Sequence, residues 1–412
     1  MTSTSYAQRD VSRPEFIVLM AALMALNALA IDVMLPALPY MGEALGIADE
    51  NERQYVIGAY MLGMGIAQLA FGPLSDRFGR RAPLLTGMAV YVTCAVAAAF
   101  APSFAMLLAL RFVQGIGAAG TRVITMSVVR DKFHGREMAE VMSLTFMVFM
   151  AIPIIAPGIG QILLLTGPWQ TIFLFMGGLA ALFSLWAFFR LPETLDPANR
   201  RPFTVAAIVQ GFHIVFTNRT AFFYGLAGMF LFGALFGFIT SSQQVYVDIY
   251  GLGVYFPVAF AAMAGLMSVS SFLNSRIVSR FGMRRLSHLA LLVFTGVSAV
   301  WLFFSVIDFL PLWLFLVHLG IIMFMFGWAA SNMNSLSMEP LGAVAGTASS
   351  VFGFIQTVGG AALGTVIGQM FNGTITPVAT GFLVMGVLTL GCVLIAENGR
   401  LFGVSESYRP AQ

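Results

Sequence analysis

The chain is poor in charge and carries almost no lysine. Only 9% of its 412 residues are charged, and Lys132 is its single lysine. Because a soluble domain places charge on roughly a quarter of its residues, so few charged side chains cannot cover a water-facing surface of this size. A phosphate-binding loop needs a lysine directly after a glycine, whereas Lys132 follows Asp131. The sequence therefore lacks the nucleotide-binding motif of an ATP-driven pump.

Cysteine and histidine are scarce as well. The two cysteines, Cys94 and Cys392, lie in separate apolar runs, where we expect packing residues and not a disulfide. The four histidines are scattered without the spacing of metal ligands, so we predict no metal site and no cofactor. The sequence offers no nucleophile together with a base and an orienting acid, and we predict that the protein is not an enzyme.

Hydrophobic residues, by contrast, make up 59% of the sequence and include 39 Phe and 25 Met. A helix needs about 20 apolar residues to cross a bilayer. Twelve runs of roughly this length are present, at residues 15–40, 54–74, 83–101, 104–129, 139–165, 169–190, 221–247, 254–278, 286–307, 310–336, 343–371 and 375–397. Because helices satisfy their backbone hydrogen bonds within one segment, we predict an all-α membrane protein with twelve transmembrane helices.

The twelve runs divide into two similar halves. The block GPLSDRFGRR at Gly72–Arg81 follows the second run, and a weaker version, SRFGMRR at Ser279–Arg285, follows the eighth. We predict an N-terminal six-helix half (1–190), a cytoplasmic linker (191–220) with a short amphipathic helix, and a C-terminal six-helix half (221–412). Two pseudo-symmetric halves of membrane helices are typical of secondary transporters.

The placement of basic residues predicts the orientation in the membrane. Arginines gather in the connections after runs two, four, six and eight, whereas the opposite connections carry mostly Asp and Glu. Basic connections stay cytoplasmic, so we predict a multi-pass protein with both termini cytoplasmic. The small excess of 21 Lys and Arg over 18 Asp and Glu therefore reflects topology, and we expect the lipid bilayer but no nucleic acid as a partner.

Asp32 is the only carboxylate deep in the apolar runs of the first half. A charge at the middle of the membrane costs roughly 2.5–3.5 kcal/mol on insertion scales, so such a residue usually has a function. Removal from water favours the protonated form of a carboxyl group, and we interpret Asp32 as a proton carrier. The alternative is that Asp32 packs helices together while permanently protonated or hydrogen-bonded.

Two arginines lie in the fourth run. At a rise of 1.5 Å per residue, Arg111 and Asp32 lie about 10 and 11 Å below the outer face. If their helices adjoin, the two side chains pair directly, pair through water, or face each other across a cavity. Arg122 returns to the same helix face about three turns later. It either extends a polar stripe towards the bundle interior or snorkels to the inner surface.

Two further segments carry unusual backbone residues. We expect a tight cytoplasmic turn at the first block, with special backbone angles at Gly72 and Gly79 and with Asp76 accepting hydrogen bonds. The arginines of this block anchor the topology: Arg77, Arg80 and Arg81. In the fifth run, Pro153, Pro157 and Gly160 predict a kinked helix. The corresponding eleventh run has no prolines, so we expect the two halves to differ in function.

These motifs together resemble the major facilitator superfamily, and within it the drug:proton antiporters of the bicyclomycin and chloramphenicol resistance type. Residues 72–81 match the loop signature of the superfamily, and Arg111 with Gln114, Gly115 and Gly117 resembles its proton-transfer motif RxxQGxG. Residues 32–39, DVMLPALP, resemble the DMYLPALP element of the drug exporters. Residues 153–160 resemble the antiporter motif, although Ala156 and Gln161 replace two of its glycines.

The resemblance implies a bacterial inner-membrane transporter, monomeric, that works by alternating access and exchanges protons for an amphipathic drug-like molecule. Asp32 would carry the proton, and Arg111 would tune its release. The resemblance places the substrate cavity between helices one, four, seven and ten, with these candidate lining residues: Asn27, Met34, Gln114, Arg122, Phe236, Gln243, Trp328 and Asn332. One alternative is a proton symporter that imports a small metabolite. Another is a non-transporting membrane sensor or scaffold.

Overall fold

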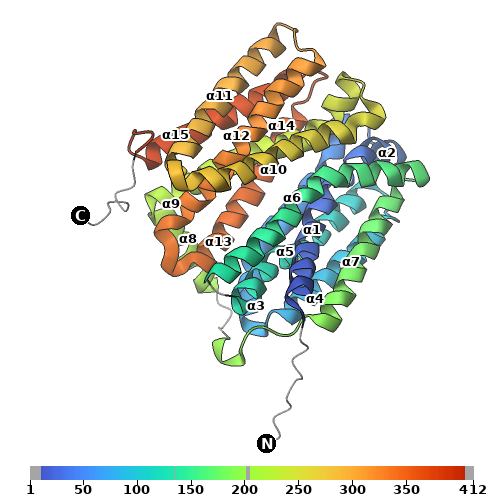
Figure 1. Ribbon diagram of the computed structural model, residues 1–412. Helices are drawn as coiled ribbons and strands as arrows, with labels where there is room; N and C mark the ends of the chain where they lie inside the picture. Colours follow the sequence, from blue (N-terminus) through green and yellow to red (C-terminus); the bar gives the residue numbers. More distant parts are fainter. Residues whose placement is uncertain (1–10, 134, 201–204, 404–412) are drawn as a thin grey trace, which may run out of the picture. The chain divides into compact units, whose positions relative to one another are not determined.

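The computed structural model describes residues 11–133, 135–200 and 205–403 (Figure 1). Within these ranges the chain is helical and contains no strand. Eleven helical segments there are long and apolar enough to cross a membrane, and an apolar stretch at Ala151–Thr166 lies in the position of the fifth predicted run. The prediction of an all-helical membrane protein is confirmed.

The longer helices follow the predicted runs closely. They are α1 (Arg13–Asp32), α3 (Tyr55–Phe78), α4 (Arg81–Ala98), α5 (Phe104–Lys132), α6 (Gly135–Thr166), α7 (Gln170–Arg190), α9 (Arg219–Gln243), α10 (Phe256–Phe281), α11 (Met283–Val306), α12 (Leu312–Met338) and α15 (Thr376–Ala396). The shorter helices are α2 (Leu38–Ala44), α8 (Val205–Thr217), α13 (Ala345–Phe354) and α14 (Gly360–Gln369). α8 lies where the sequence predicts the short amphipathic helix of the linker.

The first predicted run is interrupted. The sequence predicts one segment over 15–40, whereas α1 ends at Asp32 and a 3₁₀ turn at Leu35–Ala37 leads into α2. Proline explains the break, because Pro36 has no N–H to donate and its ring clashes with the carbonyl group four residues earlier, that of Asp32. Pro39 then lies in the first turn of α2, where a proline is well tolerated.

The helices form two compact units. Unit 1 comprises Met1–Met34 and Gly63–Val205, and unit 2 comprises Leu35–Leu62 and Ala206–Gln412. The segment 35–62, which holds α2 and the start of α3, therefore packs with the C-terminal part of the chain. The predicted division of the sequence at 190 and 221 into two halves stays a prediction.

Each unit is built around one central helix. In unit 1, α1 packs against α5, α6 and α7 and is almost wholly buried between Leu23 and Asp32. In unit 2, α9 packs against α12, α14 and α15. Two π-helical segments interrupt regular α-helix in unit 2, at Gln244–Ile249 after α9 and at Ile355–Gly359 between α13 and α14. Such segments often mark functional positions in a helix.

Candidate functional site

Asp32 lies at the C-terminal end of α1, at the break that the prolines impose. Its side chain is only 4% exposed. Among the residues that the structure describes, none forms a hydrogen bond or an ion pair with its carboxyl group. A buried carboxyl group without a partner is costly to keep charged, so this position favours a neutral Asp32 until water or a cation reaches it.

Arg111 joins α5 to α1 close to Asp32. Its guanidinium is completely buried and donates one hydrogen bond to the backbone oxygen of Ala30 (2.9 Å) and another to Oε1 of Gln114 (2.8 Å). It also lies over the ring of Phe173, 5.9 Å from the centroid. The helices of Arg111 and Asp32 adjoin, which the predicted pairing of the two side chains requires. Whether they interact directly, through water or across a cavity stays a prediction.

A second polar link joins the same two helices nearer the N-terminal end of α1. Nδ2 of Asn27 donates to Oγ1 of Thr121 (2.8 Å), and Thr121 donates to the backbone oxygen of Ala118 (2.8 Å). The next residue, Arg122, is exposed although protein atoms crowd its surroundings. Its functional role stays a prediction.

The sequence reading missed Tyr91 on α4. Its buried side chain lies close to Arg111 and to the amide of Gln114. Because Gln114 also accepts from Arg111, the three side chains form one polar cluster between α4 and α5. A lone tyrosine in an apolar run gives no sequence signal of this role.

The predicted lining residues of α12 use their polar atoms to hold α10. Nε1 of Trp328 donates to the backbone oxygen of Ser270 (3.0 Å), and Nδ2 of Asn332 donates to Oδ1 of Asn274 (2.8 Å). Phe324 stacks near Trp328, with ring centroids 5.6 Å apart. A helix-packing role accounts for these bonds, and the part of these residues in a substrate cavity stays a prediction.

The remaining lining candidates lie on two central helices. Met34 follows α1 and is fully buried, and Gln243 ends α9 with 4% of its surface exposed. Phe236 is half-buried on α9, where its ring lies 5.8 Å from that of Phe232. Phe232 in turn meets Phe326 of α12 at 5.7 Å. Unit 2 therefore carries an aromatic cluster between α9 and α12, of the kind that binds amphipathic molecules.

The block at 72–81 is built around Arg80, which the sequence analysis treated only as a topology anchor. Arg80 is 4% exposed and donates to Asp76 (2.5 Å) and to Asp131 of α5 (2.7 Å). Burial works to lower the pKa of this guanidinium, but the bonds to Asp131 and Asp76 outweigh it and raise the pKa above its ordinary value. Arg80 is thus a permanently charged centre that ties the turn to α5.

Gly79 completes the turn. Its φ of +90° is a conformation that favours glycine, and an added Cβ would collide with a carboxylate oxygen of Glu193. That carboxylate accepts hydrogen bonds from the backbone N–H groups of Arg80 (2.8 Å) and Arg81 (3.2 Å). Asp76, Gly79 and Arg80 therefore belong to one connected turn, as their fixed spacing predicts.

The weaker repeat of this block forms a comparable cluster in unit 2. Gly282 also has a positive φ, of +81°, between α10 and α11. Arg284 donates to Glu397 (2.8 Å) and pairs with Glu339 (3.3 Å), and the hydroxyl of Tyr224 donates to Glu397 (2.8 Å). Both units therefore have a glycine turn followed by an arginine bound to two carboxylates.

Other predicted features are present at their positions. Pro153, Pro157 and Gly160 lie inside α6. Cys94 and Cys392 are free and buried. Within the described ranges, no group of three or more His, Cys, Asp or Glu side chains is placed to hold a metal ion.

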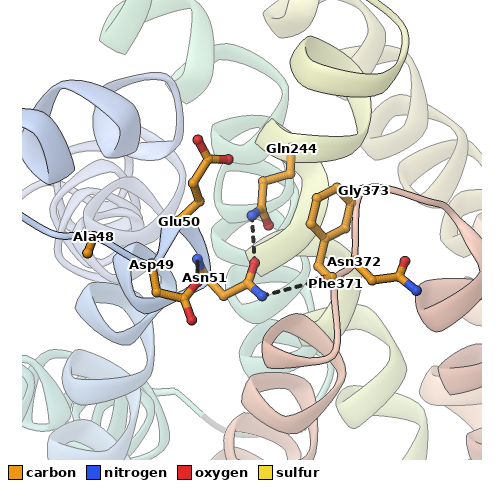
Figure 2. A pocket seen from close by; sticks show the side chains of 8 residues that line it. All are labelled: Ala48, Asp49, Glu50, Asn51, Gln244, Phe371, Asn372 and Gly373. Carbon is orange, nitrogen blue, oxygen red and sulfur yellow. Dashed lines mark hydrogen bonds between the residues drawn. The ribbon is translucent and has the colours of Figure 1, made fainter.

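A pocket of about 580 Å³ opens on unit 2, at the side predicted to be outer (Figure 2). It is lined by Ala48, Asp49, Glu50, Asn51, Gln244, Phe371, Asn372 and Gly373. The sequence gives no indication of this pocket, because its walls come from three segments that lie far apart along the chain.

Two units of packed membrane helices, each with a glycine–arginine turn at the same place, define a secondary transporter. The sequence matches the Major Facilitator Superfamily over residues 20–364. The chain belongs to this superfamily, and it is a transporter and not an enzyme.

Curated relatives are similar over nearly the whole chain. A bicyclomycin resistance protein homolog of Haemophilus influenzae is 30% identical over 96% of this chain and 97% of its own length. A chloramphenicol resistance protein of Pseudomonas aeruginosa is 28% identical over 97% and 95% of the two chains. Multidrug resistance protein D of Escherichia coli is 27% identical over 94% and 96%.

Solved structures confirm the fold. The xylose transporter XylE of E. coli superposes with a TM-score of 0.72 at 12% identity, covering 94% of this chain and 97% of that chain. The human organic anion transporter MFSD10 gives a TM-score of 0.66 at 18% identity, covering 94% and 100%.

Proposed function

We propose that this protein is a proton-coupled exporter of amphipathic, drug-like molecules. Two observations support this proposal. The chain is similar to resistance proteins over nearly its full length, and Asp32 places an ionisable carboxyl group at the end of α1. In the proposed cycle, protons enter from outside while the substrate leaves the cytoplasm.

The unpartnered carboxyl group of Asp32 is the observation on which the proposal rests. Without a hydrogen bond from a described residue, its charge is stabilised only when water or a cation approaches. Arg111 holds a positive charge on the neighbouring helix and is anchored to Ala30, two residues before Asp32. A small movement of α1 against α5 would therefore change the charge stabilisation at Asp32, which is what a proton-coupling residue requires.

The substrate is proposed to be neutral or monocationic. Asn27 and Met24, one to two turns before Asp32 on α1, carry no charge, and the amide of Asn27 is engaged with Thr121. Glu15, at the start of α1, is already paired with Arg190, so Asp32 is the acidic group of this helix left to balance a cation. A membrane potential of 100 mV contributes about 2.3 kcal/mol per charge moved, so proton entry drives export of such a substrate.

The side chains proposed to contact substrate are aromatic and amide groups on α9 and α12 in unit 2 and polar groups on α1 and α5 in unit 1. The lining residues remain those predicted from the sequence, with Phe236 and Trp328 as the aromatic surfaces. The location proposed is the bacterial inner membrane, with both termini cytoplasmic, and the proposed functional unit is a monomer with two six-helix halves.

The test is transport in inverted membrane vesicles that hold Asp32→Asn. We expect pH-driven uptake of the phenicols or cationic dyes that the parent protein transports to be lost, because asparagine cannot bind and release a proton. Asp308→Asn, at a loop position between α11 and α12 of unit 2, serves as the matched control and should keep full activity. Undiminished pH-driven uptake by an Asp32→Asn protein that inserts normally would reject the proposed role.

A further inference from the structure

A network of side-chain amides ties the 3₁₀ turn Glu50–Gln54, which precedes α3, to the ends of α9 and α14 in unit 2. Figure 2 shows the part of it around Asn51 and Gln244. We call it the amide latch; its members are Asn51, Gln54, Gln244 and Gln369. All four residues, and every bond described below, lie within unit 2.

Asn51 is the hub of the latch. Its Nδ2 donates to the backbone oxygens of Gln369 (3.2 Å) and Phe371 (2.9 Å), and its own backbone oxygen accepts from Nε2 of Gln369 (2.7 Å). Its Oδ1 accepts from Nε2 of Gln244 (2.8 Å). The side chain of Asn51 therefore uses both ends of its amide.

Gln54 extends the network one turn further. Its Nε2 donates to Oε1 of Gln244 (2.6 Å) and to the backbone oxygen of Gly368 (3.3 Å). The bonds form one chain from Gln54 through Gln244 and Asn51 to Phe371. Hydrogen bonds in such chains reinforce one another, so the latch closes or opens as a unit.

The acceptors explain why the latch forms here. α14 ends at Gln369, and the last carbonyl groups of a helix have no partner within the helix. Asn51 and Gln54 supply donors to the carbonyls of Gly368 and Gln369 at this end. The pocket of about 580 Å³ beside Asn51 and Gln244 lets water reach the same groups. Water can therefore replace the bonds when the latch opens.

The latch lies on a segment that is continuous with unit 1 at both ends. The chain passes from unit 1 to unit 2 directly after the helix break at Asp32, and it returns between Leu62 and Gly63 inside α3. On the unit 2 side, Gly58 lies against Thr365, whose Oγ1 would be 3.0 Å from an added Cβ. On the unit 1 side, Gly63 lies against the backbone oxygen of Phe112. The latch is thus what holds residues 51–54 to unit 2.

We propose that the amide latch is a gate, and that it must open in every transport cycle to release substrate at the outer side. Asn51, Gln54 and Gln244 are then functional residues of transport that act by holding α3 on α14. The proposal deepens the proposed export function and relies on it for the direction of substrate release.

The first test measures the opening directly, without substrate or proton gradient. Thr365→Cys places a thiol one turn before Gln369, where α3 covers it, in a chain whose buried Cys94 and Cys392 are replaced by alanine. Labelling by a membrane-impermeant maleimide, added from the outer side, reports separation of α3 from α14. Asn51→Asp keeps the size of the side chain but turns a carboxylate towards two carbonyl oxygens, and we expect labelling about fivefold faster.

Asn372→Asp is the matched control. Asn372 lines the same pocket, but its Oδ1 accepts only from Thr374, so its replacement should leave the labelling rate unchanged. Equal labelling rates for the two variants would overturn the gate. Because this measurement uses neither drug nor protons, a failure of the export proposal would not affect it.

The second test closes the latch covalently in the full-length protein. In Asn51→Cys/Gln369→Cys, oxidation should form a cross-link and lower drug export about tenfold or more, and a reductant should restore it. Each single cysteine variant should transport equally with and without oxidant. Full export by the cross-linked protein, or no cross-link on oxidation, would contradict the proposal.

Discussion

Arg80 shows how much one side chain contributes to the turn between α3 and α4. Its guanidinium is buried against Asp76 and Asp131, while Glu193 accepts from the adjacent backbone. Asp76 accepts from Arg80 and Gly79 has a positive φ, as the sequence predicts, but Gly72 lies inside α3 without special backbone angles, so the turn is confined to the residues after Phe78. The sequence does not indicate Asp131 and Glu193 as partners, because they lie 51 and 113 residues away from Arg80.

We expect Arg80→Ala to destabilise the protein by about 2–4 kcal/mol, because it leaves partly buried carboxylates without their cation. Arg77→Ala is the matched control: Arg77 is exposed, and its contact is with the ring of Phe78. We expect this change to cost less than about 1 kcal/mol. Thermal unfolding of the purified variants in detergent measures both, and equal losses would show that Arg80 is a topology anchor and nothing more.

Gly79→Ala tests the turn itself. It adds the strain of a positive φ, about 1–2 kcal/mol, to a collision with Glu193. Gly46→Ala has the strain alone, because Gly46 has a φ of +68° and open space around its Cα. We therefore expect Gly79→Ala to lower the unfolding temperature more than Gly46→Ala does. The difference between the two unfolding temperatures measures the effect of the contact between the added methyl group and Glu193.

At the scale of elements, the break between α1 and α2 places the proposed proton carrier Asp32 at a helix end. The long apolar runs predicted the positions of the helices well, because membrane helices need about 20 such residues. Hydropathy alone did not predict the break, since Leu35, Ala37 and Leu38 are as apolar as the helix around them. Pro36 and Pro39 carry that information, and their effect on Asp32 becomes plain only in the folded chain.

Pro36→Ala is expected to let α1 continue past Asp32. The new N–H can donate to the carbonyl oxygen of Asp32, so we expect equal or higher thermal stability together with about tenfold less proton-driven transport. Both the thermal stability and the proton-driven transport of Pro36→Ala are therefore measured. If the variant loses stability in parallel with transport, the break has no specific role.

At the scale of the whole molecule, the chain is a member of the Major Facilitator Superfamily. Asp32, whose carboxyl group has no partner among the described residues, lies two residues before the chain passes from unit 1 to unit 2. Composition and repeats predicted the fold class, because the bilayer restricts a chain of this kind to packed helices. The grouping of residues 35–62 with the C-terminal part, and the amide latch within it, were not predictable. Their partners are separated from them by 190–320 residues and share no motif with them.

We propose that Asp32 couples proton movement to transport. The most direct test measures two kinds of transport by one variant: exchange of drug across the membrane, and accumulation of drug against its gradient. In vesicles with Asp32→Asn, we predict that exchange of labelled for unlabelled drug continues, since exchange needs no proton release. Accumulation of the same drug against its gradient, driven by a pH difference, should be lost. A variant that still accumulates the drug at the parent rate would contradict the account.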